Sequence, residues 1–340
     1  MRFSRAVLAL PALALVASGC SAFSDESATD DGELTVAAAF YPLQFVAERV
    51  AGEHADVVQL TQPGTEPHDL ELSISETAEI SEADLVVYEE GFQPAVDDAV
   101  EQNAEGVALD AASVVDLMAV EETAEEHEEH GEEEHTEDEH AEDEHAEDEH
   151  TEDEHAEDEH AEEDGHDHGD VDPHFWQDPL RVADLADAVA AELADLDSEH
   201  ADDYEANAAA LRADLEDLDA AFTTGLADCE RDTIVVSHDA FGYLEKYDLH
   251  IAPIVGLSPD AEPTAAVLGE LEDLIRTEGI TTVFSEPLEP ALGEGLAADL
   301  DLTEAVLDPV EGLTDATAEE DYLSLMESNL EAIRTANACQ

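Results

Sequence analysis

The chain has 340 residues, enough for about two domains of ordinary size. Its 93 acidic residues stand against only 9 basic ones, and the formal net charge of −84 excludes charge-driven binding to nucleic acid or to an anionic membrane surface. Residues 121–172 contain 30 of the acidic residues, and the 63 that remain fit either a surface adapted to high salt or a general acidic bias of the proteome.

The N-terminus has the pattern of an export signal. Arg2 and Arg5 precede an apolar run over residues 6–17, which is too short to span a membrane as a mature helix. Ser18-Gly19-Cys20 then resembles a bacterial lipoprotein cleavage site, with Ala17 a less usual residue at its position. We expect a signal peptide at 1–19, lipidation of Cys20 and a polar spacer over 20–33. The alternative is an ordinary secreted protein in which Cys20 has no role.

Strand and helix patterns alternate in both halves of the chain. Short apolar or β-branched runs predict strands, and apolar residues at helical spacing predict helices between them. The predicted strands cover residues 34–39, 57–60, 85–88, 107–109, 233–237, 251–255, 281–284 and 305–307, and helices are expected near 75–83, 94–102, 240–247, 264–277, 292–300 and 318–335. This alternation predicts the α/β class, with mainly parallel, doubly wound sheets.

An acidic histidine tract separates the two halves. His135, His140, His145, His150, His155 and His160 recur every five residues. A five-residue step turns a helix by roughly 140°, so these side chains do not share one helix face. The tract has no apolar stripe and its charges repel one another, and we therefore expect residues 121–170 to be disordered without a bound cation.

Two helical stripes follow the tract. Residues 182–196 form the first, and residues 204–222 form the second, with apolar steps of four and three. The second helix, about 25 residues long and near 37 Å at 1.5 Å per residue, is long enough to connect two lobes.

Two cysteines remain after Cys20. Cys229 and Cys339 lie in what should be an oxidising compartment, and a bridge between them would join the C-terminus to the second lobe. The bridge would close a loop of about 110 residues, which is worth roughly 4 to 5 kcal/mol in the chain-entropy model. Two free thiols or a metal pair are the alternatives, although neither cysteine lies near a histidine in sequence.

Several potential metal ligands stand at the ends of predicted strands. His238, Glu286 and Asp308 follow strands of the second half, and His68 lies in a loop beyond a strand of the first. Ligands collect at the carboxyl ends of strands in open α/β sheets. His174 stands in VDPHFWQDP, where the tract stops and the helical pattern begins, and it is our first choice as a metal ligand.

Four segments carry a family resemblance: TEPHDLE, DPHFWQDP, SHDAFGYLEKY and LDPVEGLT, in this order. They resemble the substrate-binding lipoproteins of zinc and manganese ABC importers, from about Leu34 to the C-terminus. The resemblance implies two α/β lobes joined by one long rigid helix, with a metal site in the cleft. On this sequence the N-terminal lobe would be residues 34–197, including the tract at 121–170, the connecting helix 198–226 and the C-terminal lobe 227–340.

The family's ligand positions map onto His68, His174, His238 and an acidic residue. Asp308 is the best match, with Glu286 in reserve. Three imidazoles and one carboxylate suit Zn²⁺ in tetrahedral geometry, whereas Mn²⁺, the alternative cargo, prefers more oxygen. Asp69, Asp172, Asp178 or Asp239 could orient an imidazole.

The resemblance also implies partners. The protein would be an extracytoplasmic receptor, anchored to the cell membrane through Cys20, that delivers zinc to an ABC permease as a monomer. The tract would collect zinc weakly or sense filling, with protons competing at low pH; its alternative is a solvated loop without a specific role. The histidines concerned are His127, His130, His135, His140, His145, His150, His155, His160, His166 and His168.

Two other functions compete with this receptor. A zinc hydrolase would need an open metal position and a general base, and the sequence has no H-E-x-x-H pair, so we expect no enzyme. A surface zinc store or adhesin would use the tract as its active part and the lobes as a scaffold.

Overall fold

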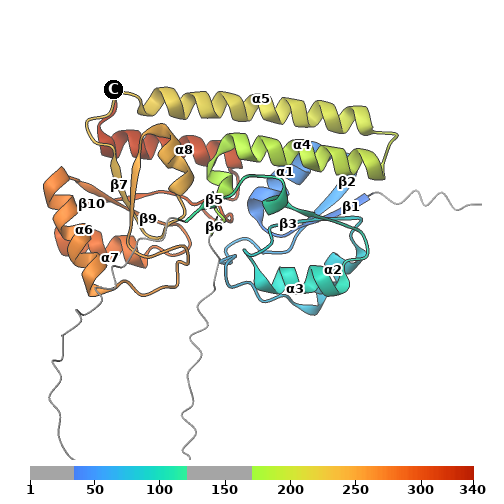
Figure 1. Ribbon diagram of the computed structural model, residues 1–340, viewed down its shortest axis with the longest axis horizontal. Helices are drawn as coiled ribbons and strands as arrows, with labels where there is room; N and C mark the ends of the chain where they lie inside the picture. The colour runs from blue at the N-terminus through green and yellow to red at the C-terminus, as the bar shows by residue number, and fades with distance from the viewer. Residues whose placement is uncertain (1–33, 121–170) are drawn as a thin grey trace, which may run out of the picture. The chain divides into compact units, whose positions relative to one another are not determined.

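The structure is a computed structural model, and it describes residues 34–120 and 171–340 (Figure 1). The expected signal peptide, the lipidation site at Cys20, the spacer and the histidine tract lie outside these residues. Within the described ranges no helix has the length and apolar character needed to cross a membrane. All eight predicted strands are present, each within two residues of its expected limits, so the predicted alternation is confirmed.

The N-terminal sheet has four parallel strands in the order β2-β1-β3-β4. They are β1 (Leu34–Ala38), β2 (Ala55–Gln59), β3 (Leu85–Tyr88) and β4 (Val107–Asp110). Helices α1 (Tyr41–Ala51) and α4 (Pro179–Leu196) pack on one face, and α2 (Ile74–Glu82) and α3 (Pro94–Asn103) on the other (Figure 1). Both faces are covered, which explains why the centres of β1 and β3 are almost wholly apolar.

The C-terminal sheet repeats this plan with the order β10-β9-β7-β8, again parallel. Its strands are β7 (Thr233–Val236), β8 (His250–Pro253), β9 (Thr282–Ser285) and β10 (Thr303–Val306). Helix α8 (Tyr322–Asn337) contacts β7 and β10, while α7 (Ala291–Leu300) contacts β9 and β10. Helix α6 (Ala265–Glu278) lies near α7 (Figure 1). The chain is therefore two doubly wound α/β lobes.

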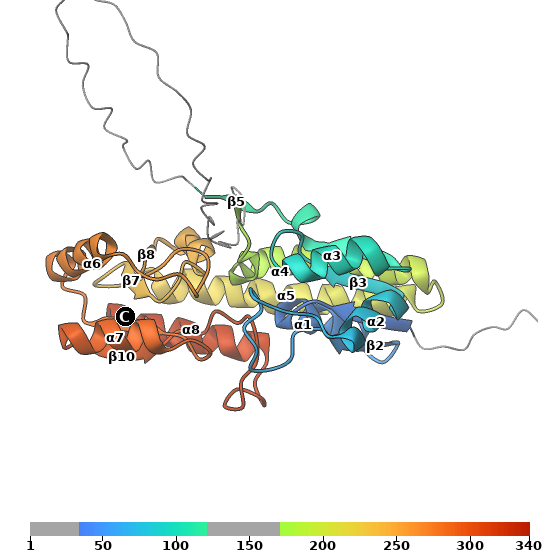
Figure 2. The same cartoon turned by 90° about the horizontal axis from the view of Figure 1, so that it is seen from below.

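One long helix, α5 (Ala201–Leu226), runs across both lobes (Figure 2). It packs against α1 and α4 of the first lobe and α8 of the second. Its inner face buries Tyr204, Leu211, Leu215 and Phe222, which are the apolar positions that predicted it. Asp178 begins the neighbouring α4 by accepting a hydrogen bond from the Leu180 amide, with Pro179 at the first helical position.

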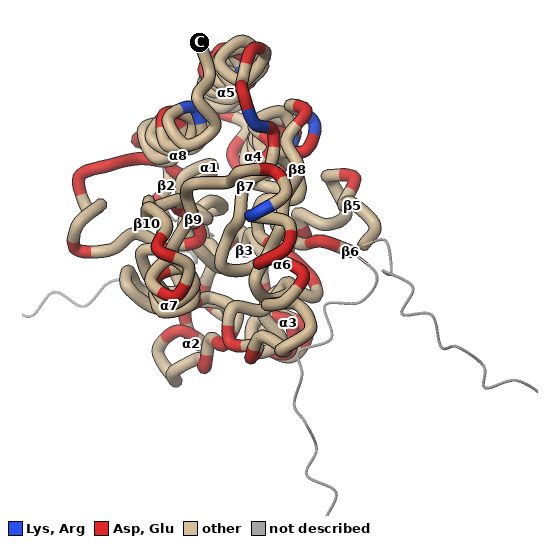
Figure 3. Tube along the Cα trace, turned by 90° about the vertical axis from the view of Figure 1, so that its left-hand side faces the viewer, with Lys and Arg blue, Asp and Glu red and all other residues tan. Residues whose placement is uncertain are grey.

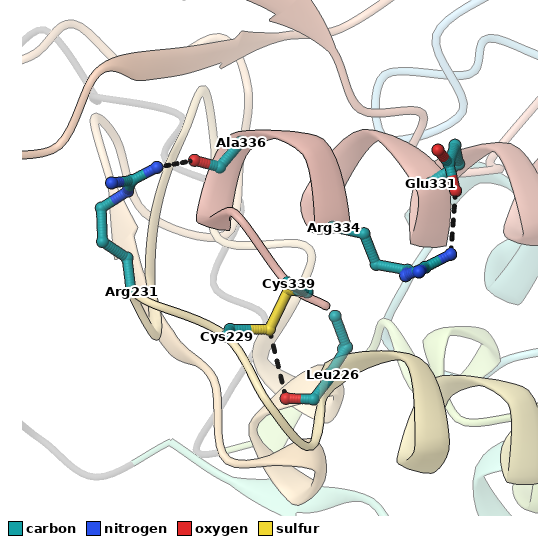
Figure 4. The surroundings of a disulfide bond; sticks show 7 residues. All are labelled: Leu226, Cys229, Arg231, Glu331, Arg334, Ala336 and Cys339. Atoms are coloured by element: carbon teal, nitrogen blue, oxygen red, sulfur yellow. Dashed lines mark hydrogen bonds and ion pairs between the residues drawn. A yellow bond between two sulfur atoms is a disulfide. The ribbon is translucent and has the colours of Figure 1, made fainter.

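The predicted disulfide is present between Cys229 and Cys339. It joins the segment after α5 to the end of α8, across a sequence separation of 110 residues (Figure 4). Beside it the Arg231 guanidinium donates a hydrogen bond of 2.6 Å to the Ala336 carbonyl. The bridge and this bond both fix the C-terminus to the second lobe.

Two local features differ from the sequence expectation. The segment after His238, expected as an α-helix at 240–247, is the 3₁₀ helix η3 (Gly242–Tyr247). A short antiparallel pair of β5 (Met118–Ala119) and β6 (Val171–Asp172), which was not predicted, brackets residues 121–170. Acidic residues lie on most of the exposed elements and basic ones on few (Figure 3).

Candidate metal centre

Four buried side chains from distant parts of the chain meet between the two sheets: His68, His174, His238 and Glu311. His68 lies in the loop between β2 and α2, and His174 lies between β6 and the 3₁₀ helix η2 (Phe175–Gln177). His238 follows β7, and Glu311 lies in the loop between β10 and α8. The carboxyl ends of the parallel strands face this position, as expected for a ligand site in α/β sheets.

Their spacing matches a tetrahedral ion. The Nε2 atoms of His68, His174 and His238 lie 3.6, 3.5 and 3.3 Å from Glu311 Oε1, and the four ligand atoms are all within 4.8 Å of one another. A tetrahedral centre with bonds of about 2.0 to 2.2 Å places its ligand atoms about 3.3 to 3.6 Å apart. The three distances to Glu311 fall in or at the edge of this range, and the whole group is compact enough to surround a single zinc-sized ion.

Two of these imidazoles are oriented by carboxylates on their other nitrogen. His174 Nδ1 and Asp172 Oδ1 are 2.8 Å apart, and His238 Nδ1 lies 2.8 Å from both oxygens of Glu286. A carboxylate at Nδ1 holds the proton there and leaves Nε2 free to bind a cation. Gly242 leaves room for this carboxylate, because a Cβ at that position would lie only 2.8 Å from Asp172 Oδ2.

Burial and charge set the protonation of the group. Burial lowers the pKa of His68 to about 4. Burial also opposes charging of His174 and His238, but the facing carboxylates outweigh it and raise the pKa of both. Burial by itself raises the pKa of Glu311, but the three imidazoles outweigh it and hold that pKa well below 4.5. Glu311 is thus an ionised carboxylate in an apolar setting.

The surroundings are dry and aromatic. All four side chains are at most 1% exposed. Phe92 packs edge-on to His68 with ring centroids 4.7 Å apart, and Trp176 packs against His174 at 5.2 Å. Such a wall excludes water and strengthens the interaction between a cation and the carboxylate.

The structure brings together three of the four expected ligands with a residue the sequence reading did not choose. Asp308 lies three residues before Glu311, and its Oδ1 accepts a hydrogen bond of 2.8 Å from the Val310 amide. Glu286 orients His238 through Nδ1 instead of joining the four ligand atoms. Asp308 was expected because it best matches the family's acidic position and follows a predicted strand; Glu311 belongs to the same LDPVEGLT segment but was not among the candidates.

Of the acids that were expected to orient an imidazole, Asp172 contacts one, whereas Asp178 has other partners. Asp172 contacts His174, as described above. Asp178 caps α4 and accepts a hydrogen bond of 2.7 Å from Lys246, the only lysine of the chain. The proposed collecting histidines between His127 and His168 lie outside the described residues.

Comparisons with known proteins agree with this architecture. A family profile described as zinc-uptake complex component A, periplasmic (ZnuA), matches residues 36–336. The chain is similar to a zinc-binding lipoprotein, AdcA, of Streptococcus pneumoniae R6, with 32% identity over 94% of this chain and 60% of that protein. It is also similar to the high-affinity zinc uptake system protein ZnuA of Bacillus subtilis 168, with 29% identity over 96% of this chain and 95% of that one.

Solved structures give the same result. The crystal structure of the Zn(II)-bound ZnuA-like domain of Streptococcus pneumoniae AdcA superposes with a TM-score of 0.66 and 29% identity. The match covers 90% of this chain and 99% of that domain, while the chain spans 58% of the full Zn(II)-bound AdcA structure. This chain therefore corresponds to one domain of the longer streptococcal proteins.

Proposed function

The chain belongs to the family of zinc-uptake complex component A, and we propose that it captures one Zn²⁺ ion between its lobes and delivers it to a membrane permease. The observation that carries the proposal is the convergence of His68, His174 and His238 on Glu311, with the spacing of a tetrahedral site. Glu311 takes the place expected for Asp308, whose carboxylate is engaged in its own turn.

The donor set favours zinc over manganese as the cargo. Three imidazole nitrogens and one carboxylate oxygen suit an ion of borderline softness in a closed tetrahedral site. Manganese prefers more oxygen ligands and a larger coordination number. The names of the streptococcal and Bacillus relatives, which specify zinc, support the same choice.

The burial of the ligands implies that the lobes part for loading and release. His68 comes from the first lobe, His238 and Glu311 come from the second, and all are at most 1% exposed. An ion reaches atoms so deeply buried only when the loops around them separate. The handover to a permease would use the same opening.

The rest of the chain fits an extracytoplasmic receptor. In this proposal residues 1–19 are removed as a signal peptide, Cys20 carries the lipid anchor and residues 20–33 form a spacer. Helix 198–226 connects lobes 34–197 and 227–340, residues 121–170 collect zinc, and an ABC permease receives it from the monomer. The description of the Streptococcus pneumoniae relative as a lipoprotein supports the anchor.

We propose that the protein does not catalyse a reaction on its ion. The family is the binding component of an uptake complex. The four ligand atoms already form a closed set, whereas a hydrolytic zinc site keeps one position open for water. Steady hydrolytic turnover of ester or peptide substrates that a chelator abolishes would overturn this part of the proposal.

Calorimetric titration with zinc tests the receptor directly. The mature chain and a variant lacking residues 121–170 are titrated side by side. The proposal predicts one tight site in both proteins and weak additional binding only in the longer one. Complete loss of tight binding on deletion would instead support a zinc store, in which the tract is the active part.

A further inference from the structure

The turn that carries Glu311 is held by hydrogen bonds at each of the three residues that precede it, 308–310. Asn329 of α8 holds Asp308 through two bonds: its Nδ2 donates to the Asp308 carbonyl at 2.6 Å, and its Oδ1 accepts from the Asp308 amide at 2.9 Å. Asp308 Oδ1 in turn accepts from the Val310 amide. All of these groups belong to the second lobe.

The other hydrogen bonds to this turn come from the first lobe. Trp176 Nε1 donates a hydrogen bond of 2.8 Å to the Pro309 carbonyl, and Gln177 Nε2 donates to the same oxygen. Both donors belong to η2 (Phe175–Gln177), which leads into α4 on the first lobe. The carbonyl before Val310 is thus held from across the cleft.

Val310 makes such anchoring necessary. Its φ of 61° lies in the left-handed region, which β-branched residues rarely adopt, and its side chain is fully buried. A strained backbone persists only where its surroundings determine it. Without the anchors the turn would relax, and the residue that follows, Glu311, would move away from the histidines.

The donors themselves are rigid. Trp176 is fully buried, and its ring packs against Phe40 and Phe92 with centroids 4.9 and 5.3 Å apart. Its own carbonyl accepts a hydrogen bond of 2.6 Å from the Tyr322 hydroxyl of α8. His174 stands two residues before Trp176, so one short segment carries both a zinc ligand and the donors that hold the turn.

We propose that Trp176 and Gln177 are positioning residues for Glu311: their shared hydrogen bonds to the Pro309 carbonyl place the carboxylate on the ion only when the lobes are closed. This inference rests on the proposed function. Asn329 and Asp308 shape the turn within its own lobe, whereas Trp176 and Gln177 couple it to the approach of the other. Closure would bring His238 and Glu311 of the second lobe to the ion, and the bonds to the Pro309 carbonyl would set the final position of the carboxylate.

The test uses the full chain with Trp176→Phe, Gln177→Met and the double variant. Phenylalanine keeps an aromatic ring but lacks the N–H donor, and methionine keeps the length of glutamine without its amide. Zinc affinity is measured by competition with a chelator of known affinity. Loss of partners that position a ligand typically weakens metal binding about 10- to 100-fold, and we expect that range for the double variant.

A double-mutant cycle with Glu311→Gln shows whether the effect acts through the carboxylate. In the Glu311→Gln background, the Trp176 and Gln177 substitutions should weaken zinc binding by less than about twofold, because the ligand they position is already lost. The absorption spectrum of bound Co²⁺ should change alike in the double variant and in Glu311→Gln. A purely structural role would leave that spectrum as in the wild type.

A matched control is Tyr247→Phe, which removes a part-buried hydrogen bond of 2.8 Å to Asp219 of α5 and none of the hydrogen bonds to the turn described above. It should leave zinc affinity and the Co²⁺ spectrum unchanged. The inference would be overturned if the Trp176 and Gln177 substitutions weakened zinc binding by the same factor with and without Glu311→Gln. The proposed receptor function would then still stand. Absence of tight zinc binding by the wild type would overturn the proposed function itself, whereas no loss in Glu311→Gln would remove Glu311 from the site and this inference with it.

Discussion

Two groups of histidines in ring contact occur among residues 34–120 and 171–340, and they differ in what their nitrogens face. In the metal centre three buried rings direct Nε2 toward one carboxylate oxygen. At the other end of α4, His54 and His200 stack face to face with centroids 4.0 Å apart and an interplanar angle of 17°. Their nitrogens face separate carboxylates, Asp203 and Asp197, and both side chains are partly exposed.

The comparison shows that residue type alone does not make a metal site. Both groups combine imidazoles with acids at short distance. Only in the buried group do ligand atoms from several elements converge, while carboxylates on the far nitrogens fix the rings. In the stacked pair one nitrogen of each ring faces a different carboxylate, so these contacts do not converge on a common point for an ion.

The largest expected effect separates the two groups directly. His238→Ala removes one of four ligands and should weaken zinc binding by more than about 100-fold, since even the loss of an outer partner costs about 10- to 100-fold. His54→Ala is the matched control and should leave the affinity unchanged. Competition titrations of both variants measure the difference, and equal affinities would remove His238 from the site.

A second pair of variants decides which carboxylate belongs to the centre. Glu311→Gln should weaken zinc binding about 10- to 100-fold, because an amide oxygen carries no charge to offset the ion. Asp308→Asn keeps the oxygen that accepts from the Val310 amide and should change the affinity less than about threefold. The reverse order in the same titration would restore Asp308 as the ligand.

A buried acid without a histidine partner sharpens the contrast with Glu311. Glu89 is 2% exposed, and neither carboxylate oxygen has a hydrogen-bond partner in the described ranges. Burial, with Asp110, Asp172 and Asp97 nearby, raises its pKa well above 4.5. The folded chain thus keeps a proton that the unfolded chain releases, and this group's contribution to stability falls as pH rises above about 4.5.

Glu89→Gln removes that pH-dependent loss. Relative to the wild type, the variant should gain about 1.4 kcal/mol of stability for each pH unit above about 4.5, until the raised pKa of Glu89 is reached. Urea unfolding at several pH values measures the gap. Glu101→Gln, on an exposed position of α3, should show no such trend. A gap of constant size across pH would contradict the assignment.

The smallest effect concerns the strained turn. Glycine normally destabilises a position by about 0.5 to 1 kcal/mol relative to alanine. At Val310 the order should reverse, because a Cβ in the left-handed region costs roughly 1 to 2 kcal/mol. The glycine variant also loses the buried Cβ that the alanine variant keeps, so greater stability of Val310→Gly would arise in spite of that loss and would report the backbone. Greater stability of Val310→Ala would show that the turn is unstrained.

The sequence predicted the fold well because its signals are local. Each strand is a short apolar run between turn residues, and each helix of the second half shows its apolar spacing. The 3₁₀ helix after His238 escaped detection because its apolar spacing also fits an α-helix. The β5 and β6 pair joins residues on either side of a long tract, and such short pairings leave no periodicity to read.

The candidate site was predictable as far as motifs named its residues. His68, His174 and His238 stand in the segments that carried the family resemblance. Glu311 was not among the expected ligands, and it comes to the site through a turn with a left-handed residue at Val310. Strand-end position favoured Asp308, and a β-branched valine gives no sequence signal for such a turn.

Anomalous diffraction at the zinc edge, on crystals of the zinc-loaded chain, tests the central claim most directly. We expect one ordered ion bound by the Nε2 atoms of His68, His174 and His238 at about 2.0 to 2.1 Å and by a Glu311 oxygen at about 2.0 to 2.2 Å. An ordered ion that Asp308 binds in place of Glu311, or one beside His54 and His200 with the buried centre empty, would contradict it.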